Sequence, residues 1–108
     1  MHTLELSEKL YLPLHNILSD LKFENERDAL IEYSLVSAMH KRSEFEDECN
    51  RFARKYNVNF EEFEKRVTDA KEENFEEWDD YMAWKFAEKG KKHWNKRINK
   101  LNDALRGS

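Results

Sequence analysis

A heptad pattern runs through residues 26–56, ERDALIEYSLVSAMHKRSEFEDECNRFARKY. Its positions recur at alternating intervals of four and three residues. One of them is the polar Arg42, and the others are Ile31, Leu35, Ala38, Phe45, Cys49, Phe52 and Tyr56. This spacing places the side chains along one stripe of an α-helix about 45 Å long. Such a stripe cannot bury itself, so the pattern predicts that a second helix or a second copy of the chain covers it.

A helix is expected on the amino-terminal side of this segment, beginning near Glu8 with Ser7 as its cap. Pro13 lies within it and either falls in the first turn or kinks the helix. Asn25, followed three residues later by Asp28, is the predicted cap of the long helix. The apolar face of the first helix would consist of Leu10, Leu14, Ile17, Leu18 and Leu21.

Two helices are expected on the carboxyl-terminal side. Asn59 is the predicted cap of a short one, because Glu62 follows at the capping-box spacing. Polar residues 71–74 are expected to end it, and a long helix follows from about Phe75 to Leu105, with Gly90 allowing a bend. The first part of that helix is expected to bury Phe75, Trp78, Met82 and Phe86. The second part would bury Trp84, Ala87, Trp94, Ile98, Leu101 and Leu105.

Composition supports an all-α protein of about four helices, two of them long. The 108 residues suit one domain, and two glycines and one proline are too few for the turns of a β-sandwich. Alternation at the amino terminus, with Leu4 and Leu6 on one side, also allows a short strand. No membrane-length apolar run and no signal-peptide core are present, so a soluble, cytoplasmic protein is expected.

The domain organisation follows from these segments. Residues 1–105 are expected to form a single helical domain, while residues 106–108 look like a cloning scar. Within the domain, residues 1–57 would dimerise and residues 58–105 would bind a partner. The dimer contacts are assigned to Leu4, Leu6, Ile31, Leu35, Ala38, Phe45 and Phe52.

No pattern of catalytic residues is recognised, and neither a cofactor nor a metal is expected. A Gly-rich phosphate loop is ruled out by the two glycines, and the lone Cys49 is best interpreted as a small buried side chain. One alternative stays open. The acidic stripe of Glu73, Glu76, Glu77 and Asp80 has the residue type with which all-helical nucleotide pyrophosphohydrolases hold Mg²⁺. A metal-dependent hydrolase is therefore the third hypothesis.

Charge is divided sharply along the second half of the chain. Residues 61–80 carry 3 Lys/Arg against 10 Asp/Glu, whereas residues 81–108 carry 8 against 2. The basic residues of the last helix are a candidate nucleic-acid contact, although they are expected to go round the helix and the protein is acidic overall. They are Lys85, Lys89, Lys91, Lys92, Lys96, Arg97 and Lys100.

Aromatic residues are concentrated at the start of the same helix, where they occupy more than one face. A helix that is apolar on two faces belongs to a larger core or awaits a partner. Trp and Tyr are typical anchors of protein interfaces. The candidate partner-binding residues are Phe75, Trp78, Asp79, Asp80, Tyr81, Trp84 and Trp94.

The amino-terminal stretch, LSEKL at residues 6–10 through LKFENERDALI at residues 21–31, resembles a subunit of the ribbon-helix-helix repressors. The resemblance implies a dimer whose two-stranded ribbon buries Leu4 and Leu6. Thr3 and Glu5 would face the DNA groove, with Lys9 as a further weak DNA contact. Lys22 stands where that family usually has glycine in the turn.

A second resemblance covers residues 43–101 and rests on the aromatic and acidic residues of KYN at 55–57, FEEF at 60–63 and ENFEEWDDYMAW at 73–84. This part is similar to small archaeal and bacterial proteins that look like antitoxins of toxin–antitoxin modules, including partners of TumE-type toxins. The resemblance implies a non-enzymatic protein whose carboxyl-terminal part covers a toxin. Its carboxylates would face a basic toxin site while Trp78 and Trp84 anchor the contact. A DNA-binding regulator is the alternative.

Overall fold

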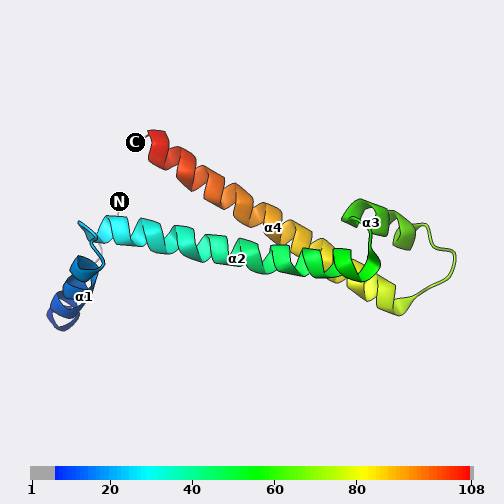
Figure 1. The fold of residues 1–108 in the computed structure, drawn as a ribbon, viewed down its shortest axis with the longest axis horizontal. Helices are drawn as coiled ribbons and strands as arrows, with labels where there is room; N and C mark the ends of the chain where they lie inside the picture. Colours follow the sequence, from blue (N-terminus) through cyan, green and yellow to red (C-terminus); the bar gives the residue numbers. More distant parts are fainter. Residues whose placement is uncertain (1–6, 108) are drawn as a thin grey trace. The chain divides into compact units, whose positions relative to one another are not determined.

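The computed structural model describes residues 7–107, so the predicted strand and its residues Thr3, Leu4, Glu5 and Leu6 lie outside it. The described residues form four α-helices and no strand (Figure 1). These are α1 (Glu8–Asp20), α2 (Glu26–Tyr56), α3 (Phe60–Thr68) and α4 (Phe75–Gly107). The predicted all-α class, with two long helices, is confirmed. None of these helices is both long and apolar enough to cross a membrane.

The chain divides into two compact units, and the division falls within α2. The first unit ends at Leu35 and the second begins at Val36. The candidate site lies in the second unit, which comprises most of α2 together with α3 and α4.

In the first unit, α1 begins at Glu8, which places Pro13 inside the helix rather than in its first turn. Ser7 takes the N-cap position, but its side chain makes no capping hydrogen bond. Asn25 does cap α2, since its Oδ1 accepts a hydrogen bond from the backbone N–H of Asp28 at 2.9 Å. α1 has no buried residue. Its exposed large apolar side chains are Leu10, Tyr11, Leu12 and Ile17.

In the second unit, α2 and α4 run antiparallel and are joined by side-chain contacts between residues 42–56 of α2 and residues 76–95 of α4. The ring of Phe52 stacks on that of Trp84 with centroids 5.8 Å apart. Further towards the start of α2, Arg42 Nη1 donates a hydrogen bond to Asn95 Oδ1 at 3.1 Å. Arg42, the one polar residue of the heptad pattern, therefore has a partner within its own chain.

α3 completes the core by lying against α4, close to the point where the chain leaves α2 (Figure 1). Asn59 caps α3 as predicted, because its Oδ1 accepts from the N–H of Glu62 at 2.8 Å. Phe63 has no exposed surface, and its ring lies 5.4 Å from that of Trp84. The buried cluster consists of Cys49, Phe52, Phe63, Tyr81, Trp84 and Ala87. The prediction that Cys49 is a buried apolar residue is confirmed.

This core covers the second half of the heptad stripe with helices of the same chain. Phe52, predicted as a dimer contact, is 1% exposed, so its side chain is unavailable to a second copy. Phe45 also packs against the core. Of the other predicted dimer contacts, Ile31, Leu35 and Ala38 are partly buried.

α4 continues through Gly90, where the absence of a side chain permits a close approach to α2. A Cβ atom at this position would lie 2.7 Å from ring atoms of Phe45. Gly90→Ala should therefore lower the free energy of unfolding by about 1 kcal/mol, because overpacking costs about 1–3 kcal/mol and the better helix propensity of alanine returns about 1 kcal/mol. Urea unfolding followed by circular dichroism measures this change.

Phe45→Ala supplies the control for that prediction. Without the ring, only the propensity gain remains, so Gly90→Ala should stabilise the Phe45→Ala protein by about 1 kcal/mol. A destabilising effect of equal size in both backgrounds would contradict the proposed contact between Gly90 and Phe45.

Candidate interaction surface on α4

α4 carries apolar side chains on two opposite faces in its first half. One face is buried against α2 and α3 through Tyr81, Trp84 and Ala87. The other face we call the outer stripe, and it consists of Phe75, Trp78, Met82 and Phe86, which are 75%, 48%, 50% and 67% exposed. The prediction that these four residues are buried is wrong. Both neighbouring helices of the unit pack on the Trp84 side, and among the described contacts α2 reaches the stripe only at its end, where the rings of Phe45 and Phe86 meet edge to face with centroids 5.8 Å apart.

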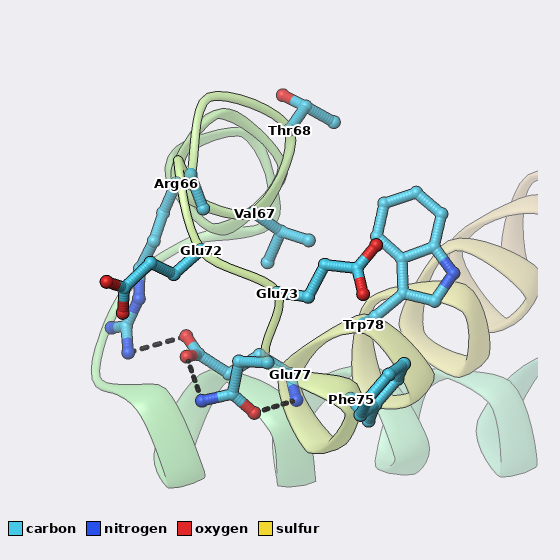
Figure 2. A pocket seen from close by; sticks show the side chains of 10 residues that line it. Arg66, Val67, Thr68, Glu72, Glu73, Phe75, Glu77 and Trp78 are labelled. Carbon is cyan, nitrogen blue, oxygen red and sulfur yellow. Dashed lines mark hydrogen bonds and ion pairs between the residues drawn. The ribbon is translucent and has the colours of Figure 1, made fainter.

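The start of α4 is held in place by a small polar network. Asn74 caps the helix by accepting from the backbone N–H of Glu77 at 3.1 Å, and its own Nδ2 donates to Glu77 Oε2 at 2.8 Å. Arg66 of α3 binds the other oxygen of Glu77 at 2.6 Å. These contacts, shown in Figure 2, link α3 to α4 at the corner between them.

A cavity of about 540 Å³ lies at this corner. Val67 and Ala70 form an apolar part of the cavity wall on one side, and Phe75 and Trp78 form an apolar part on the other. Because the last two residues also begin the outer stripe, the cavity and the stripe form one continuous surface. In Figure 2 the carboxylate of Glu73 lies between Val67 and Trp78.

Carboxylates of the predicted acidic stripe form ion pairs with two different cations of the chain. Lys55 Nζ lies 3.0 Å from Glu76 Oε1 and 2.7 Å from Asp80 Oδ2, and Arg66 holds Glu77. Cations thus already bind three of the four carboxylates of the stripe, and the fourth, Glu73, lines the corner cavity. Among the described residues, no group of three or more His, Cys, Asp or Glu side chains is arranged to hold a metal ion.

Asp80 also connects α4 to Tyr56, whose hydroxyl donates a hydrogen bond to it. Burial alone would raise the pKa of Asp80, but the hydrogen bonds from Lys55 and Tyr56 outweigh it and lower that pKa. Burial and the neighbouring carboxylate together raise the pKa of Tyr56 to about 12. Asp80 therefore links α4 to α2, and only part of its side chain is accessible to a partner.

The structure separates the predicted partner-binding residues into two groups. Trp78 and Asp79 are exposed, as is Phe75, and Trp94 is partly exposed. Tyr81 and Trp84 are buried in the core, so the expectation that Trp84 anchors a partner is corrected. The sequence prediction also missed Met82 and Phe86 as surface residues. Their signal is the spacing of three, four and four residues from Phe75, which is out of phase with Trp84 and Ala87.

The second half of α4 has a basic outer surface. Between residues 89 and 100 every exposed residue except Asn99 is basic. We call this set the basic face, and it consists of Lys89, Lys92, His93, Lys96, Arg97 and Lys100. The prediction that the cations go round the helix is wrong, because only Lys91 in this segment turns towards the packed side, where it pairs with Glu88 at 3.5 Å.

Of the three DNA contacts predicted at the amino terminus, Lys9 alone lies in the described residues, and it is exposed on α1. Comparison with known proteins found no matching family model, no matching curated protein and no matching solved structure.

Proposed function

We propose that this chain is a non-enzymatic interaction protein, similar to a type II antitoxin, that covers a partner protein with the outer stripe of α4. The observation that carries the proposal is the exposure of four large apolar side chains on one helix face opposite the core. Contiguous exposed apolar surface of this kind marks interaction sites. Trp78 and Phe75 also open onto the corner cavity, which offers room for a partner side chain.

The charges beside the stripe favour a basic partner. Asp79 is exposed next to Trp78, and Glu72 and Glu73 line the cavity. An acidic rim round aromatic anchors steers a basic protein into place and fixes its orientation. A cytoplasmic toxin whose own site attracts nucleic acid has the required charge.

A ribbon-helix-helix regulator is the second candidate, and the turn between α1 and α2 favours it. Lys22 has φ of 66°, in the left-handed region that favours glycine, which is the residue the repressor family usually has there. The Asn25 cap follows, as that resemblance requires. The exposed apolar side chains of α1 would then be covered by a second copy of the chain.

Co-expression with the product of the neighbouring gene tests the main proposal. The protein should co-purify with that product, and Trp78→Ala/Phe86→Ala should weaken the complex roughly 30-fold or more, as expected for loss of interface anchors. Titration by calorimetry measures the affinity. The matched control is Val36→Ala/Met39→Ala, which removes two exposed apolar side chains of α2.

The control variant should bind like the original protein. Equal weakening by both double variants, or no complex with the neighbouring product, would contradict the proposal. Circular dichroism should show that both variants remain folded, because all four substituted side chains are largely exposed.

A further inference from the structure

The basic face of α4 brings together cations that have no acidic partner among the described residues. Other cations of the second unit are paired with carboxylates, as in Lys41 with Glu44 and Arg66 with Glu77. Those without an ion pair, such as Arg54, Lys65 and Lys71, lie on different segments rather than together on one helix face. No Asp or Glu occurs between Lys89 and Asn102. Among the described residues, no ion pair engages the five Lys and Arg residues of the basic face. The pattern is thus a concentration of unpaired charge rather than an ordinary mixed surface.

Packing determines the direction in which these cations point. Ile98 is buried, and Trp94 and Asn95 are partly buried on the side of α4 that faces α2. Residues 92, 96 and 100 recur at intervals of four, which keeps them on the opposite side. Since α2 holds α4 through Arg42 and Asn95, the helix cannot rotate to hide the charges.

We propose that the basic face is a binding site for the phosphodiester backbone of nucleic acid. From Lys89 to Lys100 the helix rises about 16 Å, and a DNA strand presents a phosphate every 3.4 Å or so along its axis. Four or five phosphates of one strand therefore fall within reach of the five cations.

The composition of the basic face favours nucleic acid over an acidic protein or a membrane. Four of the five cations are lysine, which is depleted in protein interfaces but contacts phosphate readily as a point charge. No exposed residue between 89 and 100 is apolar, whereas a helix that lies in a membrane inserts apolar side chains alongside its cations. Phosphate contacts need only the charges.

The overall charge of −4 does not oppose this binding, because the acidic residues are concentrated elsewhere. Residues 61–80 hold ten of them, and Lys55 and Arg66 neutralise several. The site is also separate from the outer stripe, which ends at Phe86. Its test is therefore independent of the proposed partner.

Fluorescence anisotropy with labelled 20-nucleotide DNA, single-stranded in one arm and duplex in the other, tests the proposal on the full chain. Binding should appear at about 50 mM salt. For the duplex, the logarithm of the binding constant should fall with the logarithm of salt at a slope between about −3 and −4.5, corresponding to three to five neutralised phosphates. A single strand should give a shallower slope of about −0.7 per phosphate.

The decisive comparison is between two triple variants of equal charge. Lys89→Glu/Lys92→Glu/Lys96→Glu should weaken binding at least tenfold and flatten the salt slope. Arg54→Glu/Lys65→Glu/Lys71→Glu changes three exposed cations outside the basic face and should leave both nearly unchanged. Each variant has the same net charge of −10, from −4 and three reversals of −2. A difference in DNA binding between them therefore depends on where the reversed charges lie and not on the net charge.

Three outcomes would overturn the proposal. The first is absence of binding to both forms of DNA at 50 mM salt. The second is equal loss in the two triple variants. The third is stronger binding to polyglutamate or to phosphatidylserine vesicles than to either DNA, which would assign the basic face to an acidic protein or a membrane.

Discussion

Replacing Trp84 by alanine is expected to lower the free energy of unfolding of the second unit by about 3–5 kcal/mol, as large aromatic truncations in cores do. Trp84 is 1% exposed and lies within 6 Å, ring centre to ring centre, of Phe52, Phe60 and Phe63. Small domains are stable by only about 5–15 kcal/mol. The substitution therefore removes a large part of what holds α2, α3 and α4 together.

Two matched substitutions show whether the loss comes from core packing. Trp84→Phe should cost much less than alanine, because the indole Nε1 has no hydrogen-bond partner among the described residues and a ring is retained. Trp78→Ala should cost less than about 1 kcal/mol, since Trp78 is half exposed. Urea unfolding at neutral pH measures all three variants. Similar losses for Trp78→Ala and Trp84→Ala would contradict the assignment of the two faces.

The helices and their caps could be predicted because the signals are local. Asn25 and Asn59 lie three residues before the N–H groups that they bind, and both caps form as predicted. The start of α4 at Phe75 was also predicted, while the capping role of Asn74 was missed although Glu77 follows at the same spacing. Local hydrogen bonding of this kind depends little on where other helices pack.

The choice between the two apolar faces of α4 could not be made locally. Trp78 and Trp84 both belong to apolar stripes with helical spacing. The residues next to them in sequence do not indicate which of the two stripes packs against α2. Phe52 and Phe63, distant in sequence, decide the matter by packing on Trp84. Because the Trp84 side of α4 packs against these residues, Phe86 is exposed and Phe52 lies in the core of its own chain.

The basic face can be predicted from the spacing of the basic and apolar residues in α4. Lys92, Lys96 and Lys100 repeat every four residues, and Trp94 and Ile98 repeat every four residues between them. Two interleaved patterns of the same period predict a basic side and an apolar side of one helix. The net charge of the whole chain concealed this local separation.

Alkaline solution is expected to unfold the second unit as the buried thiol of Cys49 and the partly buried hydroxyl of Tyr56 lose their protons. Burial, with a smaller contribution from Glu88, raises the pKa of the Cys49 thiol from 9.0 to about 12. Tyr56 rises from 10.0 to about 12, chiefly through burial and then through Asp80. In both residues the folded state favours the neutral form. Their stabilising contribution is complete below pH 9 and is lost as the pH rises to about 12, where the unfolded chain has released both protons.

The size of this loss makes it measurable. The rise in the pKa of Cys49 corresponds to a loss on the order of a few kcal/mol, a sizeable part of the total stability of a small domain. Other groups nearby change in the same direction, because the hydrogen bond to Glu64 and burial raise the pKa of Tyr81. Urea unfolding between pH 7 and pH 12 should show a falling midpoint above pH 9.

Cys49→Ala and Tyr56→Phe separate the contributions of the two groups. Cys49→Ala should flatten the curve between pH 9 and pH 12, and Tyr56→Phe should flatten the part above pH 10. The difference in tyrosinate absorbance between the unsubstituted protein and Tyr56→Phe should rise together with the loss of helix, because Tyr56 ionises as the core opens. If Cys49→Ala loses stability in parallel with the unsubstituted protein across this range, the buried thiol is not the source of the alkaline instability. Such a result would move the cause to the Lys55 contacts that join α2 to α4.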